Sequence, residues 1–263
     1  MRMKNYFSLL RRFSIASLLF ILASTMVHAK EMIIIYAQGY EPFSWKDKDG
    51  RIRGIDIDFL DELLNKKMGI PIRHKVYPWA RAQLLVRNGE SDAFLTIPSP
   101  KRRTYTEITK LPLYESNFIL CTGATNPHIE ELRDIKSLEE LKRRNHLRHV
   151  MILGGGWHER NLIGVKYLKK VTNSTQILRM LELNREDVYI EQVALIDYQI
   201  KLLKLEDKII KIPNVMEVAK WHLCVGKKSS FVGVIPKLNQ LIAEMKKKGD
   251  IDRIQRRILK KYR

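Results

Sequence analysis

The sequence predicts an α/β protein made of two lobes, each a mainly parallel sheet flanked by helices. Apolar runs of strand length alternate with amphipathic helical patterns along the chain, which is typical of parallel sheets covered by helices. This alternation starts again after residues 117–122. Of the 263 residues, the 234 that follow the first 29 are also more than one compact core requires, so we expect two lobes of roughly 100 to 150 residues each.

In the first half, the expected elements begin with a buried strand over residues 32–37, where the apolar run is continuous. Apolar residues then recur at helical spacing over residues 57–68, with Asp56 as the expected N-cap and Gly69 as the stop signal. Further patterns indicate a strand over 70–76, a helix over 78–88 that ends at a glycine, and a strand over 92–97.

The second half repeats this pattern. Ser137 and Glu140 match a capping box, which predicts a helix from residue 138. A strand over residues 150–153 then runs into three consecutive glycines. The remaining expected elements are a helix around residues 177–181, a strand over 188–190, a helix over 235–245 and a last helix from residue 250.

The N-terminal 29 residues have the pattern of a secretory signal. Four basic residues precede an uncharged apolar run over residues 13–26, and a small-x-small ending stands before Lys30. The apolar run has 14 residues, whereas a membrane-spanning helix needs roughly 20. We therefore expect residues 1–29 to be a cleaved signal peptide and the mature protein to be soluble in the periplasm. An uncleaved membrane anchor is the alternative.

Composition and charge exclude several classes of protein. Hydrophobic residues make up 45% of the chain, which excludes a disordered polymer, and two cysteines are too few for a disulfide-stabilised mini-protein. The segment from residue 30 onward holds 44 basic and 29 acidic residues, a net charge of +15. In an exported protein this charge favours anionic small molecules or membrane phosphate as partners, and it argues against nucleic acid.

Several motifs occur in an order that resembles a known family. They are residues 39–45 (GYEPFSW), 54–58 (GIDID), 88–93 (NGESDA), 99–102 (SPKR), 137–141, 150–159, 184–188 and 221–228. In this order they resemble the periplasmic solute-binding proteins of ABC importers, specifically the polar amino-acid-binding family (bacterial extracellular solute-binding protein family 3). The resemblance implies the type II periplasmic-binding-protein fold, in which the chain crosses between the lobes twice. Lobe 1 then comprises residues 30–115 and 221–263, and lobe 2 comprises residues 116–220.

The same resemblance implies capture of a solute rather than catalysis. A small carboxylate-bearing solute, an amino acid or a related molecule, would be held between two lobes that close by a hinge and delivered to an ABC permease. We expect a monomer without a cofactor. Two alternatives stay open: a solute-sensing subunit for a membrane receptor, and an exported dehydratase-like enzyme, for which Glu41 and Glu191 are the candidate acid–base residues.

Arg102 is the expected anchor of the solute carboxylate. The resemblance places an arginine at this position, and a guanidinium can donate two parallel hydrogen bonds to a carboxylate. Thr96 and Ser99 offer hydroxyl groups nearby. The alternatives are that Arg102 belongs to a solvated basic run and that Arg103 takes its place.

Three aromatic residues are expected on the wall of lobe 1, namely Tyr40, Phe43 and Trp79, where they would pack against an apolar or cationic group of the solute. The alternative is that they are ordinary core. Trp79 begins a helix beside a strand end, where clefts of open α/β sheets form.

In lobe 2 the expected ligand-binding residues are Gly155, Gly156, Trp157, Glu191 and Gln192. Glycines between a strand and a helix leave backbone N–H groups free to face an anion. The resemblance places an aspartate that binds the solute's α-amino group where Gln192 stands. Glu191 is the remaining candidate for that role if its side chain turns inward.

Cysteine and histidine spacing indicates no metal site. The seven histidines form no His-Glu-x-x-His motif and no Cys-x-x-Cys occurs, so the sequence predicts no zinc site. Cys121 and Cys224 are expected to be two buried thiols, although a disulfide stays open in an oxidising compartment. His158 is a candidate for the mouth of the cleft, and the alternative is an ordinary polar residue on the first turn of a helix.

Overall fold

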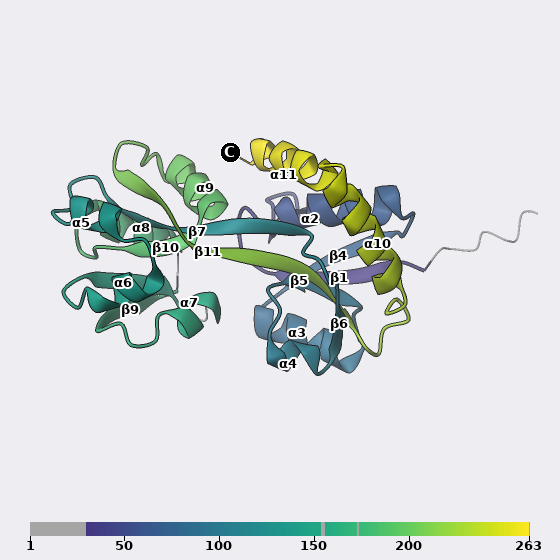
Figure 1. Ribbon diagram of the computed structural model, residues 1–263. Coiled ribbons are helices and arrows are strands. Elements are labelled where there is room, and N and C mark those ends of the chain that lie inside the picture. The colour runs from purple at the N-terminus through teal and green to yellow at the C-terminus, as the bar shows by residue number, and fades with distance from the viewer. Residues whose placement is uncertain (1–29, 154–155, 173, 263) are drawn as a thin grey trace, which may run out of the picture. The chain divides into compact units, whose positions relative to one another are not determined.

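The computed structural model describes residues 30–153, 156–172 and 174–262 (Figure 1). The expected signal peptide, residues 1–29, lies outside the described residues. The chain divides into one unit that ends at Glu31 and a second unit from Met32 to Arg263. The second unit contains all of the described helices and strands, and none of those helices is long and apolar enough to cross a membrane.

One seven-stranded mixed sheet runs through the second unit. Its strands are β1 (Met32–Ala37), β4 (Ile72–Tyr77), β5 (Ala93–Thr96), β6 (Thr106–Ile108), β7 (Tyr114–Gly123), β10 (Tyr189–Gln192) and β11 (Ile209–Gly226). They are ordered β10-β7-β11-β5-β1-β4, and β6 also pairs with β11. The sequence led us to expect mainly parallel pairing. β1 is parallel to both β4 and β5, whereas β11 is antiparallel to β5, β6 and β7, and β10 is antiparallel to β7.

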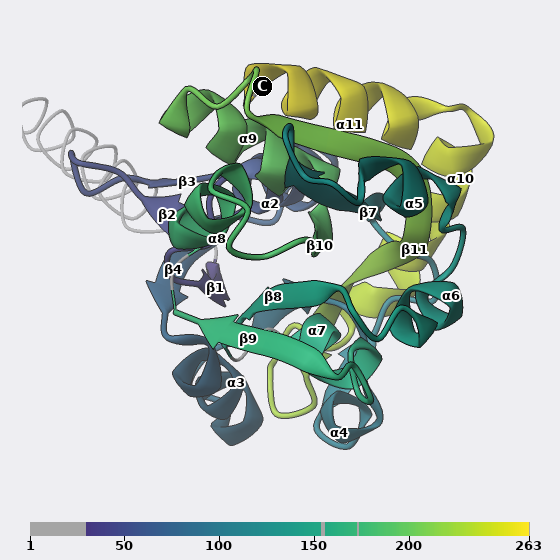
Figure 2. The same ribbon diagram turned by 90° about the vertical axis from the view of Figure 1, so that its left-hand side faces the viewer.

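Two smaller sheets complete the β structure. The strands β8 (Arg148–Ile152) and β9 (Tyr167–Val171) form a parallel pair, which lies side by side in Figure 2. The strands β2 (Trp45–Lys46) and β3 (Ile52–Arg53) form a short antiparallel ribbon. An isolated parallel bridge from His149 to Val188 brings β8 next to the start of β10.

The strands β7 and β11 connect the two halves of the second unit. They pair with each other over ten positions, from Tyr114 opposite Trp221 to Gly123 opposite Ile209. Figure 1 shows them running together from the region of helices α2, α10 and α11 to the region of α5, α8 and α9. The helices are α2 (Ile55–Leu60), continued by a π-helical segment η1 (Asp61–Lys67), and α3 (Trp79–Asn88), α4 (Pro100–Arg103), α5 (Ile129–Asp134), α6 (Leu138–Arg143), α7 (Gly156–Asn161), α8 (Ser174–Glu182), α9 (Val193–Leu203), α10 (Val234–Lys247) and α11 (Asp250–Lys261).

The start of helix α2 differs from the sequence expectation. The helix begins at Ile55, so Asp56 is not its N-cap but a buried residue inside its first turn. Gly54 makes this entry possible, because its φ of 142° is open to glycine and an added Cβ would lie 2.0 Å from the carbonyl oxygen of Phe43. The expectation for α6 is confirmed, since the Ser137 hydroxyl accepts a hydrogen bond of 3.2 Å from the backbone N–H of Glu140.

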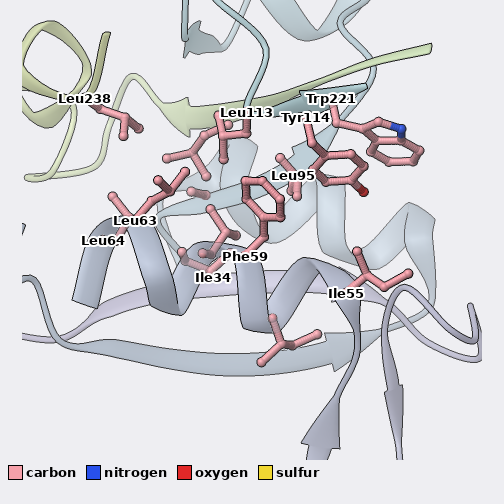
Figure 3. Close-up of a cluster of buried hydrophobic side chains, with 14 of the residues drawn as sticks. Ile34, Ile55, Phe59, Leu63, Leu64, Leu95, Leu113, Tyr114, Trp221 and Leu238 are labelled. Atoms are coloured by element: carbon pink, nitrogen blue, oxygen red, sulfur yellow. The ribbon is translucent and has the colours of Figure 1, made fainter. Parts of the chain in front are cut away.

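The hydrophobic core around α2 explains why this helix and the sheet pack together. Phe59, Leu63 and Leu64 follow helical spacing and are fully buried, facing side chains of β7, β11 and α10 (Figure 3). The rings of Phe59 and Tyr114 lie 5.1 Å apart. Each such side chain contributes about 1.5 to 3 kcal/mol by leaving water. Two further clusters bury side chains of β7, β8, β10 and the helices around them.

Cys121 and Cys224 are both buried free thiols. Strand register explains why they do not meet. Cys121 of β7 lies opposite Lys211 of β11, whereas Cys224 is 13 residues further along that same strand. Burial raises the pKa of both thiols, so they are protonated and unreactive at neutral pH.

Candidate functional site

A cavity of about 750 Å³ lies within the second unit, in the size range of roughly 300 to 1,000 Å³ that small-molecule sites occupy. Its wall is built from the ends of β1, β5 and β10, the loop after β1, and the helices α4, α7 and α9. Residues from both sides of the β7–β11 connection therefore face one space. Ligand sites of open α/β sheets form at such strand ends.

Arg102 lines this cavity and is held in position before any ligand arrives. Its Nη1 donates a hydrogen bond of 2.7 Å to the carbonyl oxygen of Ile97, and its Nε donates to Oε1 of Gln83 at 3.3 Å. The guanidinium also lies over the ring of Trp79, 5.4 Å from the ring centroid. Within the described part of the chain, Nη2 makes no hydrogen bond to protein. This nitrogen is therefore available to a ligand.

A second guanidinium, that of Arg160 in α7, lies in the same wall. Burial lowers the pKa of Arg102, and the positive charge of Arg160 lowers it further. The two cations thus lie close enough to repel each other. We call Arg102 and Arg160 the basic wall; an anion placed against it would relieve that repulsion.

Glu191 supplies negative charge to the same cavity. Its side chain is buried at the end of β10 and lines the cavity wall. The hydroxyl of Tyr189 donates to Oε2 at 2.9 Å, and the backbone N–H of Gln192 donates to Oε1 at 2.9 Å. The ring nitrogen Nε2 of His158 lies 3.8 Å from Oε2 and donates to the carbonyl oxygen of Ile190 at 2.7 Å.

Asp56 is a second buried carboxylate on the wall, and we call Asp56 and Glu191 the acidic wall. The hydroxyl of Tyr114 donates to Asp56 Oδ1 at 2.5 Å. Burial raises the pKa of Asp56 to about 7, although this hydrogen bond lowers it in part. Burial also raises the pKa of the Tyr40 hydroxyl, and the charges of Glu191 and Asp56 raise it further. Tyr40 therefore lies near both carboxylates.

Aromatic rings connect the basic and acidic walls. Tyr40, Trp79 and Trp157 all line the cavity, as the sequence led us to expect. The ring of Trp157 is stacked on Phe118 at a centroid distance of 4.3 Å, and its Nε1 donates to Glu217 at 2.7 Å. These contacts fix the ring, so its face presents a rigid apolar surface to the cavity.

Of the expected site residues that the structure describes, three do not line the cavity. Phe43 is buried between Tyr40 and Trp221, at centroid distances of 5.0 and 5.9 Å, so it belongs to the core. The Ser99 hydroxyl accepts from the backbone N–H of Arg102 at 3.3 Å and caps α4, so it positions the arginine. Gln192 is the third residue.

Gln192 is fully buried because its amide joins three strands and a loop. Its Oε1 accepts from the Ser116 hydroxyl at 2.7 Å, and Ser116 Oγ in turn accepts from Trp221 Nε1 at 2.9 Å. Its Nε2 donates to the hydroxyl of Tyr40. An aspartate could not donate this bond, so the glutamine serves packing where the family resemblance places an ammonium-binding residue.

The structure thus brings together most of the residues expected from the sequence. Tyr40, Trp79, Thr96, Arg102, Gly156, Trp157 and Glu191 line the cavity. Gly155 lies outside the described residues. Arg103 is exposed and, among the described residues, is not part of the cavity wall.

Asp56 and Arg160 line the cavity but were not expected there from the sequence, and the place of His158 was open. A signal for Asp56 existed, because an acidic residue on the apolar face of a helical pattern is unusual. Arg160 and His158 follow the glycine run within one helix, but their spacing does not reveal which side faces the cavity. His158 lies in the first turn of α7, is buried and lines the cavity.

Comparison with known proteins assigns the family. The sequence matches the bacterial extracellular solute-binding proteins, family 3, over residues 32–261. A "Probable amino-acid ABC transporter-binding protein" of Haemophilus influenzae is 25% identical over 188 residues, 66% of this chain and 69% of that protein. A histidine kinase sensor domain with similarity to periplasmic binding proteins has a TM-score of 0.68 at 16% identity, covering 88% of this chain and 96% of its own. An ancestral arginine-binding protein bound to arginine has a TM-score of 0.65 at 20% identity, covering 88% and 99%.

These matches agree with the architecture described above. The two solved structures share the fold of this chain, which is the two-lobed α/β fold of periplasmic binding proteins expected from the sequence. The family match covers nearly all of the second unit, from the first residue of β1 to the last residue of α11. The chain belongs to the bacterial extracellular solute-binding proteins, family 3.

Proposed function

We propose that this protein binds a small amino acid in the cavity and delivers it to an ABC importer. The observation that supports this best is the pairing of a basic wall with an acidic wall around one space of about 750 Å³. A zwitterion satisfies both walls at once, whereas an anion or a cation alone leaves one wall uncompensated.

The carboxylate of the amino acid binds Arg102 in this proposal. Two donors of Arg102 are already fixed by Ile97 and Gln83, so the guanidinium is oriented without further loss of side-chain freedom. The side chain of Arg102 is also half-buried, so the guanidinium has already lost part of its water. A ligand carboxylate therefore has less water to displace. Thr96, at the end of β5, lies on the same wall and adds a hydroxyl group.

The ammonium group binds Glu191, which takes the role that the resemblance gives to position 192. Glu191 Oε1 and Oε2 each accept one hydrogen bond from protein donors, the N–H of Gln192 and the hydroxyl of Tyr189. An ionised carboxylate accepts about four hydrogen bonds, so capacity for an ammonium group remains. Asp56 lies on the same wall and, with its pKa raised by burial to about 7, adds part of a negative charge at neutral pH.

The named relatives support the class of solute and the importer partner. The Haemophilus influenzae relative is described as an amino-acid ABC transporter-binding protein, and a solved structure of the same fold holds arginine.

We also propose that the protein acts as a monomer in the periplasm after cleavage before Lys30. Mass spectrometry of the exported protein tests this cleavage, and a mass that includes residues 1–29 contradicts it.

Titration calorimetry with the natural amino acids tests the proposed function. The amino acid that binds best is compared with its decarboxylated amine and with its 2-hydroxy acid, each of which lacks one charged group. We expect both analogues to bind at least about 30-fold more weakly, since each loses a charged hydrogen bond worth about 2 kcal/mol. If none of the natural amino acids shows saturable binding, the proposal is contradicted.

A matched pair of variants places the ligand. Arg102→Gln removes the charge in the basic wall, whereas Arg103→Gln removes the same charge from the neighbouring exposed residue. We expect only the first variant to lose binding. Equal loss of binding in the two variants, or no loss of binding in either, contradicts a role for Arg102.

Capture without turnover is part of the proposal. Glu41 and Glu191 both line the cavity, so an acid–base reaction on the same fold is the enzymatic outcome to test. Proton NMR of the bound amino acid, and of prephenate-like substrates, after incubation with the protein is expected to show unchanged compounds. Formation of a product contradicts capture.

Loss of amino-acid uptake in cells lacking the protein supports importer delivery, and unchanged uptake points instead to a sensing role.

A further inference from the structure

A group of three side chains with metal-ligand chemistry lies outside the cavity. His128 directly precedes α5, Glu131 is in the first turn of that helix, and His146 lies in the connection from α6 to β8. One ligand atom from each residue lies within 4.8 Å of the other two. None of the three residues lines the cavity among the described residues, so the proposed amino-acid site leaves this cluster unexplained.

The ligand atoms of the cluster lie near the spacing of a zinc site: the contact of His128 with Glu131 has that spacing, and the contact of His146 with Glu131 is shorter. Glu131 Oε2 lies 2.9 Å from His146 Nε2 and 3.6 Å from His128 Nδ1. Zinc bonds of about 2.0 to 2.2 Å in a tetrahedron place neighbouring ligand atoms roughly 3.3 to 3.6 Å apart. The two imidazole rings lie 5.1 Å apart at an angle of 55°, so both approach the same carboxylate oxygen without stacking on each other.

The backbone around the cluster is anchored in the core. Leu132 and Leu147, each next to a ligand residue in the sequence, are buried. The backbone N–H of His128 donates to Asn126 Oδ1 at 2.8 Å, which fixes the entry to α5. Three ligands on anchored segments need little rearrangement to enclose an ion.

Arg144 has two opposing effects on this cluster. Its Nε lies 3.2 Å from Glu131 Oε1, which orients the carboxylate so that Oε2 faces the imidazoles. Its positive charge also repels a cation nearby. The cluster therefore has a spacing close to that of a zinc site, but we expect a lower affinity than three ligands alone would give.

We infer that His128, Glu131 and His146 form a Zn²⁺ site in which three protein ligands leave the fourth position open to water. Two imidazoles and one carboxylate are the ligand set of known zinc sites, and imidazole ligands favour Zn²⁺ over Mg²⁺ and Ca²⁺. The ion joins α5 to the connection before β8. The sequence hides this site, because His146 is 15 residues from Glu131 and no zinc motif has that spacing.

Calorimetric titration of ZnCl₂ into the exported protein, prepared without a polyhistidine tag, tests the site. We expect one Zn²⁺ per chain, and no binding of MgCl₂ or CaCl₂ under the same conditions. His128→Ala and His146→Ala are expected to lower the affinity at least about tenfold each. His74→Ala is the matched control, because His74 contacts the carboxylate of Asp61 in a place where no second imidazole approaches among the described residues.

Two further measurements keep the test independent of folding. Circular dichroism of each variant without metal shows whether it folds, and Glu131→Gln, which keeps its size, tests the carboxylate. Arg144→Gln is expected to raise the Zn²⁺ affinity, since a repelling charge is removed. Absence of Zn²⁺ binding by the unmodified protein overturns the inference, and so does binding that His128→Ala and His146→Ala leave unchanged. These outcomes do not depend on whether the protein binds an amino acid.

Discussion

The guanidinium of Arg102 lies over the ring of Trp79, 5.4 Å from its centroid, while Ile97 and Gln83 accept two of its hydrogen bonds. The side chain is thus oriented by an aromatic face and one acceptor from α3 and by a second acceptor that directly follows β5. A charged group held in this way, with Nη2 available, is suited to one planar anion such as a carboxylate.

Arg102→Lys is expected to weaken amino-acid binding about 30-fold although it keeps the charge. Lysine cannot donate in the fixed planar geometry of a guanidinium, and loses the stacking on Trp79. The loss corresponds to about 2 kcal/mol. Calorimetric titration measures it, and Arg103→Lys serves as the control. Undiminished affinity in Arg102→Lys means that a point charge suffices and that the fixed position of the guanidinium donor is not needed.

Asp56 makes the stability of the protein depend on pH. Burial raises its pKa to about 7 from 3.8, so the folded state holds a proton at pH 5 that the unfolded state has released. The free energy of unfolding contributed by this group therefore falls as the pH rises from about 4 to about 7, and stays constant above.

Asp56→Asn removes this dependence, because asparagine keeps the acceptor for Tyr114 but cannot ionise. Relative to the unmodified protein, the variant is expected to gain about 3 kcal/mol of stability between pH 5 and pH 8. Urea denaturation at both values measures the change. If the difference in stability between the two proteins is the same at pH 5 and pH 8, Asp56 does not titrate in this window.

Asp187→Asn is expected to destabilise the protein by about 2 to 3 kcal/mol. Burial alone would raise the pKa of Asp187, but the hydrogen bonds from Arg148 outweigh it and lower the pKa. The backbone N–H of Arg148 donates to Asp187 at 2.8 Å, and the guanidinium of Arg148 donates to it at 2.9 and 2.8 Å. These three bonds join the start of β8 to the segment before β10. Urea denaturation measures the loss. The exposed Asp252→Asn is the control, and a loss as small as in this control rejects the structural role of Asp187.

Gln192→Asp is expected to lower stability by about 2 to 4 kcal/mol and to bring no gain in amino-acid affinity. The aspartate loses the donor to Tyr40 and puts a second negative charge next to Glu191. Thermal unfolding and calorimetric titration measure the two effects, with the exposed Gln176→Asp in α8 as control. Tighter binding by Gln192→Asp contradicts the assignment of the ammonium group to Glu191.

Local patterns predicted the elements that local interactions decide. The apolar run of β1, the capping serine of α6 and the glycine that ends α3 all act through neighbours within four residues. Motif order, through the family resemblance, also indicated Arg102, which lines the cavity, but for the ammonium partner it indicated position 192, one residue away from Glu191. The position of Arg102 could thus be predicted, although its hydrogen bonds to Ile97 and Gln83 could not.

Features that depend on distant segments were not predictable in this way. The inward position of Asp56 depends on Tyr114, 58 residues away, and the core position of Gln192 depends on Ser116 and Tyr40. The direction of chain pairing in β11 and the approach of His146 to Glu131 also depend on tertiary contacts. Such contacts leave no periodic signal in the sequence.

A crystal structure of the protein with the amino acid that binds most tightly tests the central claim most directly. We expect a carboxylate oxygen of the ligand within about 3.2 Å of Arg102 Nη2 and the ammonium nitrogen within the same distance of Glu191. A ligand bound outside the cavity, or one whose carboxylate does not contact Arg102, contradicts the account.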